Sequence, residues 1–359
     1  MRRAASVLVL ALLLPACRAG YVLKQYQGQR KIQREMRPVA DVLADPSVDE
    51  KTRSKLRWVL RAREFGIRKV GLEETANYTW HYDTGGKPVA WNVTACRKHA
   101  FKERRWWFPI VGSVPYLGFF DKEDALSEKR GLDEDGWDTH LSEVAAYNTL
   151  GWYVDPVFSP MLRSDEGQLA ATVLHEMTHG TVYLPGQSDF DETLAEWVGN
   201  EAARELLVEE YGEGSAPVKG FADDLEDEVR FNAFLHEVRQ ELERLYAGSI
   251  AREEKVARRE AVFTQAKERF AGTLPQYHTQ AYAGFLNKPL NNALILSYGR
   301  YHARTDLFDR IFESHGRDLR ATVAFFATLG GSDDARKAME EWLAERSASP
   351  TPADTPGGS

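Results

Sequence analysis

The chain has 359 residues, of which 43% are hydrophobic and 28% charged, so it can form a large core and is not globally disordered. Its formal charge of −8 argues against a general nucleic-acid binder, and its mean hydropathy of −0.46 excludes a protein with many membrane spans. Two cysteines, Cys17 and Cys96, are too few for a disulfide framework or a cysteine-rich zinc finger.

Residues 1–16 have the pattern of a secretory signal peptide. A cationic start precedes an apolar run over 4–14, which is too short for a membrane span of about 20 residues. Residues 14–17, Leu-Pro-Ala-Cys, resemble the lipobox of bacterial lipoproteins, and this implies cleavage before Cys17 and acylation of its thiol. The resemblance further implies attachment to the bacterial membrane through that lipid. Arg18 after the cysteine favours the periplasmic side of the outer membrane.

The following segment predicts helices first and then strands. Helices are expected over 21–39 and 49–70, with a break at Asp45-Pro46, because proline disfavours helix in the residue before it. Alternating aromatic and polar residues over 78–93, around a turn signal at 83–86, predict a β-hairpin. A second extended stretch over 106–116, a short helix over 120–130 and a strand over 145–153 are expected next.

The rest of the chain is helical in pattern. We expect helices over 164–181, with Ser164 as N-cap, and over 190–208, 291–313 and 317–345. A long charged helical region over 221–272 should break near 247–249 and carry a solvated face. The predicted fold is α+β and predominantly helical, with a small mixed sheet, in one domain over 17–346. The tail 347–359 is rich in Ser, Pro, Thr and Gly and is expected to be disordered.

His175, Glu176 and His179 carry the predicted chemistry. Four helical residues turn through about 400°, so the two imidazoles share one helix face and can bind one Zn²⁺ at about 2.0–2.1 Å. Glu176 lies beside them, where it can act on a zinc-bound water molecule. A second His-Glu pair begins at His236 but has Gln240 in place of the second ligand, so we interpret it as part of a surface helix.

A catalytic zinc ion needs a third protein ligand and an open position. Glu192 and Glu196 are four residues apart on the next predicted helix, so both side chains can point the same way. We assign Glu192 as the ligand and Glu196 as the carboxylate that accepts the outer N–H of a ligand histidine. Ala195 would let the two helices pack closely. Asp189 and Asp191 are alternative ligands, but they fit loop and capping positions better.

The segment from His175 to His179, followed by Asp191 to Ala195, resembles the gluzincin pattern HExxH…ExxA. The short spacer over 180–191 is similar to that of a family of predicted bacterial aminopeptidases, many of them lipoproteins. The segments 17–21, 107–120, 146–156 and 291–301 extend the resemblance over most of residues 17–330. It implies a zincin-like catalytic core, an active-site helix carrying HExxH, Zn²⁺ as cofactor and peptides as substrates.

This chain departs from the family pattern at two places. Asp191 stands where an asparagine is usual, directly before the ligand glutamate. Family members often carry a cysteine pair where this chain has Trp107 and Ser113, so a disulfide is absent there. Neither departure removes a metal ligand.

The expected reaction is peptide hydrolysis by a metal-activated water molecule, with Glu176 as general base and then as proton donor to the leaving amine. By analogy with zincins, we expect Tyr301, or else Tyr298, to stabilise the oxyanion. A predicted strand would pair with an extended substrate as the edge strand of the cleft. Its residues are Tyr147, Asn148, Thr149, Leu150 and Gly151.

Three other functions are compatible with parts of the sequence. A zinc-stabilised envelope lipoprotein without catalysis, acting as scaffold or chaperone, has no need for the base Glu176 beside its metal. A hydrolase of cell-wall peptides or other amides would be expected to add a wall-binding module, and the sequence shows none. A partner surface on 221–272 is less favoured than a solvated face, and no particular protein partner is expected. Exopeptidase and endopeptidase action stay open, with Glu143 and Glu196 as acids that could hold an α-ammonium group.

Overall fold

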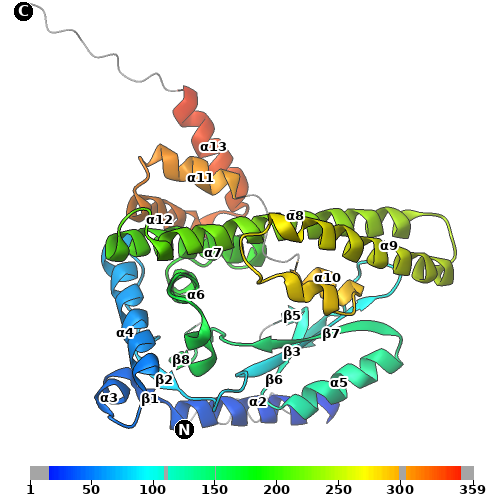
Figure 1. Cartoon of the computed structure of the whole chain (residues 1–359), viewed down its shortest axis with the longest axis horizontal. Helices are drawn as coiled ribbons and strands as arrows, with labels where there is room; N and C mark the ends of the chain where they lie inside the picture. Colours follow the sequence, from blue (N-terminus) through cyan, green and yellow to red (C-terminus); the bar gives the residue numbers. More distant parts are fainter. Residues whose placement is uncertain (1–15, 109–111, 150, 299–304, 349–359) are drawn as a thin grey trace, which may run out of the picture. The chain divides into compact units, whose positions relative to one another are not determined.

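The computed structural model describes residues 16–108, 112–149, 151–298 and 305–348, so residues 1–15 of the predicted signal peptide lie outside it (Figure 1). The chain divides into two compact units. The first contains the residues up to 49 together with 79–163 and 233–298; the second contains 50–78, 164–232 and the residues after 298. None of the helices in the described part has the length and apolarity that a membrane crossing requires.

The first unit combines small sheets with helices (Figure 1). Its strands are β1 (Arg37–Pro38), β2 (Trp80–Tyr82), β3 (Ala90–Arg97), β4 (Trp106–Phe108), β5 (Gly112–Val114), β6 (Tyr116–Phe119), β7 (Trp137–Val144) and β8 (Val157–Phe158). Its helices are α2 (Ala16–Glu35), α3 (Val39–Ala44), α5 (Lys122–Glu134), α9 (Arg252–Thr273), α10 (Asn292–Tyr298) and the last part of α8 (Ala216–Ala247). Short 3-10 turns are η2 (Ser159–Arg163), η3 (Leu274–Gln276) and η4 (Ala283–Asn287).

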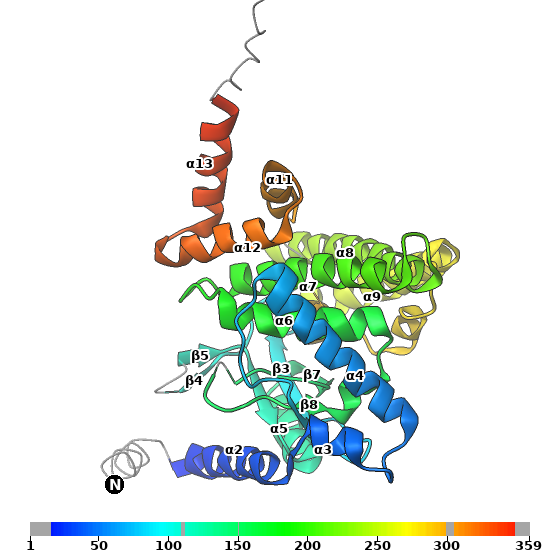
Figure 2. The ribbon, with the colours of Figure 1, turned by 90° about the vertical axis from the view of Figure 1, so that its left-hand side faces the viewer.

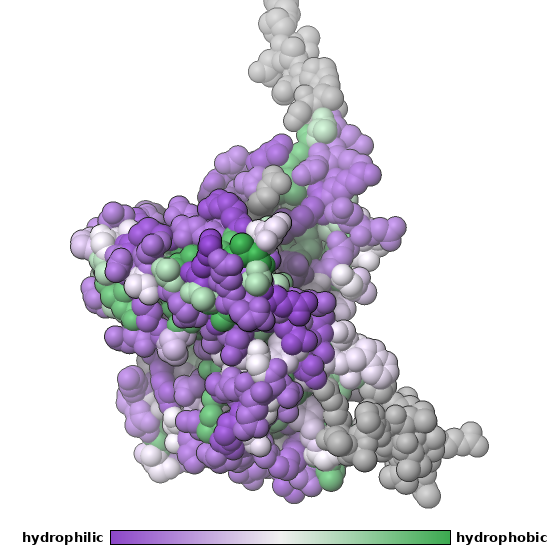
Figure 3. All heavy atoms as spheres, turned by 90° about the vertical axis from the view of Figure 1, so that its right-hand side faces the viewer, coloured by the Kyte–Doolittle hydropathy of each residue, from purple (hydrophilic) through white to green (hydrophobic). Residues whose placement is uncertain are grey.

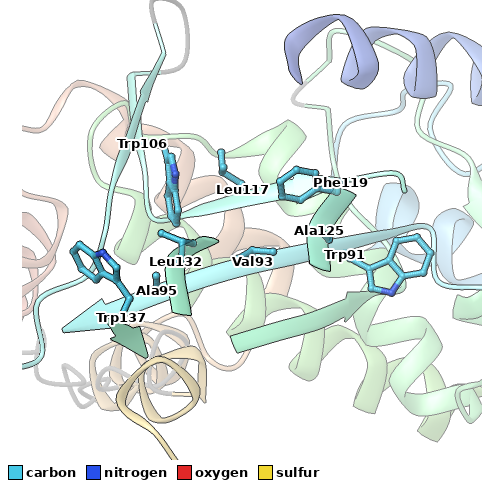
Figure 4. Packing of buried hydrophobic residues seen from close by; sticks show 9 residues of the cluster. All are labelled: Trp91, Val93, Ala95, Trp106, Leu117, Phe119, Ala125, Leu132 and Trp137. Carbon is cyan, nitrogen blue, oxygen red and sulfur yellow. The ribbon is translucent and has the colours of Figure 1, made fainter. Parts of the chain in front are cut away.

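The main sheet of this unit has the order β6-β3-β7, and both pairs are antiparallel. A core cluster covers one of its faces, with α5 packed over it (Figure 4). The members are Trp91, Val93, Ala95, Trp106, Leu117, Phe119, Ala125, Leu132 and Trp137. On the opposite face Cys96 packs against Ala293 and Leu296 of α10. Cys96 is therefore a buried small residue, and burial raises the pKa of its thiol to about 12.

A buried ion pair joins this sheet to α9. The Arg259 guanidinium donates to both carboxylate oxygens of Asp138, at 2.5 and 3.0 Å, and both side chains are about 5% exposed. The backbone N–H of Asn292 donates to the same carboxylate at 2.9 Å. Because each charge is paired and hydrogen-bonded, the pair can exist away from water.

The second unit is helical in its described residues (Figure 2). It consists of α4 (Glu50–Phe65), the π-helical turn η1 (Gly66–Val70), α6 (Glu166–Thr181), α7 (Ser188–Tyr211), residues 216–232 of α8, α11 (Asp306–Ser314), α12 (Leu319–Thr328), η5 (Leu329–Gly331) and α13 (Ala335–Ala348). The predicted α+β, predominantly helical class is confirmed. The breaks at Asp45-Pro46 and near 247–249 are also confirmed. Helix α13 ends at Ala348, and residues 349–359 of the predicted tail lie outside the described residues.

The predicted hairpin over 78–93 is wrong. β2 pairs with β1 and β8, whereas β3 pairs with β6 and β7, so the two strands belong to different sheets. The turn itself is present, because the Gly85 N–H donates to the Asp83 carboxylate at 2.9 Å. Thr84 then donates its N–H to the Ser159 hydroxyl. An alternating pattern thus located both strands, but it carries no information about their partners.

The predicted strand over 145–153 is also wrong, because its described residues form a loop after β7. The backbone N–H of Thr149 donates to the Asp155 carboxylate at 3.0 Å, and the N–H of Trp152 donates to the Thr149 carbonyl at 3.1 Å. Gly151 has φ +79°, in the left-handed region that glycine tolerates. These local bonds fold the segment back on itself, and the strand in this region is β7.

Candidate metal centre

Helices α6 and α7 of the second unit carry the predicted metal ligands. Helix α6 is capped by Asp165, whose carboxylate accepts the Gln168 N–H at 2.9 Å, so the predicted cap at Ser164 is wrong by one residue. One face of the helix is buried through Leu169, Val173 and Leu174, which fixes its rotation. This rotation leaves the half-buried His175 and His179 on the side that meets α7.

Three side chains converge between these helices. The Nε2 atoms of His175 and His179 lie 3.2 Å apart. Glu192 of α7 places one carboxylate oxygen 3.5 Å from the His175 nitrogen and the other 3.7 Å from the His179 nitrogen. Of the described residues, these three form the group of His, Cys, Asp and Glu side chains whose ligand atoms could hold a metal ion.

The separations fit a single ion. Bonds of about 2.0–2.1 Å at a tetrahedral angle of about 109° place ligand atoms about 3.3–3.4 Å apart. The observed 3.2, 3.5 and 3.7 Å bracket that value. Two imidazoles and one carboxylate are also the donors of many catalytic zinc sites, which keep a fourth position open. The three residues therefore fit a divalent metal ion without a change of backbone.

The charges around the ligands favour a cation. Burial lowers the pKa of His175, but hydrogen bonding to Glu192 and the charges of Glu176, Glu192 and Glu196 outweigh it, and the pKa is raised. Burial and the neighbouring His175 hold the pKa of His179 low, near 4. The carboxyl groups of Glu176 and Glu192 beside two imidazoles supply negative charge that a divalent ion would neutralise.

Glu196 lies one turn after Glu192 and is partly buried. Burial, and secondly the charge of Glu228 from α8, raise its pKa to about 8. Burial likewise raises the pKa of Glu228 itself, with Asp224 adding to the shift. The predicted hydrogen bond from a ligand histidine to Glu196 stays a prediction. Its charge does act on His175.

Asp191 holds the loop between α6 and α7. Its side chain is 3% exposed, and its Oδ1 atom accepts the backbone N–H of Leu184 at 2.9 Å. An asparagine at this position could accept the same bond, which explains how an aspartate can replace the residue usual in the resembling family. Burial raises the pKa of Asp191 to about 6. We therefore interpret Asp191 as a residue of the first turn of α7 that fixes the preceding loop, and not as a ligand.

The other predicted site residues are placed as follows. Tyr301 and Leu150 lie outside the described residues. Tyr298 belongs to the first unit, where its hydroxyl accepts the Lys288 ammonium at 2.5 Å. Tyr147, in the same unit, donates its hydroxyl to Gln29 at 2.6 Å. The roles predicted for these residues and for Asn148, Thr149 and Gly151 stay predictions, without the strand that was expected to carry the last three.

Two further candidates have clear positions. Glu143 lines a cavity of about 770 Å³ in the first unit, beside His140 and Lys288. His236 lies on an exposed face of α8, where its Nε2 atom is 2.9 Å from the Gln240 amide nitrogen. This confirms the interpretation of the second His-Glu pair as a surface feature. One structural residue was missed: Gly199, where the backbone of α7 lies close against that of α6. A glycine on a helix facing another helix was the available signal.

Two adjacent helices thus bring together two imidazoles and a carboxylate that could hold one divalent metal ion, with an acid beside them. A sequence profile of the family described as “Putative aminopeptidase” matches residues 20–341, and the chain belongs to this family. The match supports a peptidase-like activity. No curated protein and no solved structure matches the chain.

Proposed function

We propose that the chain is a zinc-dependent peptidase, and more narrowly an aminopeptidase. The observation that carries the proposal is the convergence of His175, His179 and Glu192 at the spacing of a tetrahedral metal site. Membership of an aminopeptidase family supports the class of reaction. The donor set supports zinc, because imidazole and carboxylate are ligands that this ion accepts readily.

Each residue of the site has its own role in the proposed reaction. A bound zinc ion would supply a Lewis acid that polarises the scissile carbonyl and lowers the pKa of a water molecule toward about 7. Glu176, half-buried and next in the chain to a ligand, takes the proton as water attacks and gives it to the leaving amine. His175, His179 and Glu192 would hold the metal, and their positions on α6 and α7 set where they stand relative to Glu176.

Aminopeptidase action requires an acid that holds the α-ammonium group of the substrate. Glu196 and Glu228 are the acids of the second unit that are suited to this role. Burial and neighbouring acids raise the pKa of both side chains. A bound ammonium group would lower it again, because it favours the charged carboxylates. Tyr301 or Tyr298 is proposed as the donor to the oxyanion. The lipid on Cys17 is proposed to hold the enzyme on the periplasmic side of the outer membrane.

Metal analysis and peptide turnover test the proposal together. The purified protein should contain about one zinc ion per chain and should cleave peptides with a free N-terminus faster than N-terminally blocked ones. A chelator should abolish turnover, and added zinc should restore it. His179→Ala should lose both metal and activity, whereas the matched change His236→Ala on the exposed face of α8 should lose neither. Full activity of the His179→Ala protein would refute the assignment, and bound zinc without turnover would favour a scaffold.

A further inference from the structure

Exposed apolar side chains gather on two segments of the first unit. Nine large hydrophobic residues are exposed in the described part of the chain, and five of them lie on α2 or on the strands β4 and β6. Their exposed fractions run from 40% for Val22 to 66% for Trp107. The five residues are Val22, Leu23, Tyr26, Trp107 and Tyr116. The face drawn in Figure 3 is mostly hydrophilic, with hydrophobic residues interspersed.

Tyr21 holds the two segments together. Its ring packs on Phe108 with 5.8 Å between centroids, and its hydroxyl donates to the Gly118 carbonyl at 2.9 Å. Val22 and Leu23 directly follow Tyr21, and Trp107 directly precedes Phe108. The exposed residues therefore flank one contact between α2 and β4, and the first half of α2 lies on the same side of the unit as the strands β4 and β5 (Figure 2).

The exposed face of α2 is cationic as well as apolar. At 100° per residue, Val22, Tyr26, Arg30, Leu23 and Arg34 fall within an arc of about 120°. From Tyr21 to Glu35 the helix has four cationic residues and one acid, although the whole chain has 46 cationic and 54 acidic residues. Aliphatic and aromatic side chains flanked by Lys and Arg are the pattern of surfaces that lie in a membrane interface.

We propose that this region, formed by α2 and the strands β4 to β6, binds the surface of a bilayer that contains anionic lipid. The aromatic and aliphatic side chains would enter the interfacial layer, and Arg30 and Arg34 would contact lipid headgroups. Helix α2 begins at Ala16, two residues after the apolar run 4–14, and Cys17 is its second residue. At 1.5 Å per residue, Tyr26 lies only about 14 Å along the helix from Cys17, so a lipid there would place this face at the membrane.

Vesicle binding tests the surface apart from any lipid anchor. The processed chain 17–359 with Cys17→Ser lacks both the apolar leader and the acylation site, and of the described residues it omits only Ala16. It should bind vesicles of phosphatidylcholine that contain about a quarter of phosphatidylglycerol, and it should bind vesicles of phosphatidylcholine alone more weakly. Salt at about 0.5 M should weaken binding to the mixed vesicles.

Three variants locate the contact. Leu23→Glu and Trp107→Ala should each weaken binding to the mixed vesicles by about tenfold or more, since each removes an apolar group from the interface. Both residues are exposed, so unchanged circular dichroism and unchanged peptide turnover are expected. The matched change Val229→Glu, at a residue that is 70% exposed on α8, should alter binding by less than about twofold. Absence of vesicle binding, or equal binding by all three variants, would overturn the proposal and leave the peptidase assignment untouched.

Discussion

Gly199 of α7 lies against the carbonyl oxygen of Ala171 on α6, so closely that a Cβ atom at residue 199 would come within 2.7 Å of that oxygen. The same Cβ atom would lie 3.1 Å from the backbone nitrogen of His175 and 3.2 Å from its Cβ atom. The two helices therefore meet at the residue that carries a metal ligand. The absence of a side chain at 199 keeps Glu192, two turns earlier on α7, within reach of both histidines.

Gly199→Ala should weaken metal binding without changing any ligand. The added methyl group must push the backbones apart, because the atoms it meets belong to the main chain and to the stem of His175. We expect a loss of about 1–3 kcal/mol in the free energy of unfolding, together with a lower zinc affinity. Chemical denaturation and competition with a chromophoric chelator measure the two effects. Gly180→Ala is the control, since a Cβ atom there meets nothing within 4 Å, and it should retain zinc affinity.

Glu176→Gln should bind zinc normally but turn over peptides about 10²–10⁴-fold more slowly, because the amide cannot accept the proton of the attacking water molecule. Metal content and single-turnover kinetics separate the two properties. The same substitution at Glu237, in the exposed His-Glu pair of α8, should leave both unchanged. Turnover of the Glu176→Gln protein at the wild-type rate would remove Glu176 from its role.

Asp138→Asn should destabilise the first unit by about 3–5 kcal/mol, because it leaves the Arg259 guanidinium buried without a counter-charge. Urea denaturation followed by circular dichroism gives the free energy of unfolding. A suitable control is Glu254→Gln on α9, the helix that carries Arg259. This change removes the partner of the exposed Arg258 and should change the free energy of unfolding by less than about 0.5 kcal/mol. Equal effects of the two substitutions would mean that the buried pair contributes no more than a surface pair.

The stability of the first unit should fall as the pH is lowered. Burial, helped by the charges of Lys288 and Lys129, lowers the pKa of His140 from 6.5 to about 4. Between these two pH values the unfolded chain holds a proton on His140 that the folded chain does not. The free energy of unfolding is therefore highest above pH 6.5 and falls as the pH is lowered. Below about pH 4 this contribution of His140 changes no further. At pH 5 the loss should be about 2 kcal/mol.

His140→Gln isolates this contribution. The difference in unfolding free energy between neutral pH and pH 5 should be smaller in the variant than in the wild type by about 2 kcal/mol. Denaturation curves at several pH values provide the measurement. Identical pH dependence in the two proteins would show that His140 titrates normally in the folded state.

Much of the candidate site could be predicted because it depends on local geometry. The spacing of His175 and His179 fixes their common helix face whatever surrounds the helix. Glu192 required one more step, namely that the next helix packs against the first, and the short spacer over 180–191 makes that arrangement natural. The presence of α7 and the break between α8 and α9 followed from periodicity and local residues, although α7 and α8 extend beyond the predicted 190–208 and 221–272.

Neither the pairing of the strands nor the burial of charged side chains could be predicted in this way. The partners of β2 and β3 lie far away in the chain, and an alternating pattern fits any of them equally well. The loop over 145–153 has residues typical of a strand, but Asp155 and Thr149 offer the backbone local hydrogen bonds instead. Arg259 lies in a helix that was expected to present a solvated face, yet Asp138 of β7 holds it in the interior.

The helical character of the chain and the placement of two imidazoles on one helix face could be predicted from the sequence, because these features depend on residues within a turn or two of one another. The tertiary structure decided which strands pair, where Arg259 is buried, and that α6 and α7 approach at Gly199 closely enough for Glu192 to reach both histidines. These features depend on contacts between distant segments, whose free energy is settled only when the whole core packs.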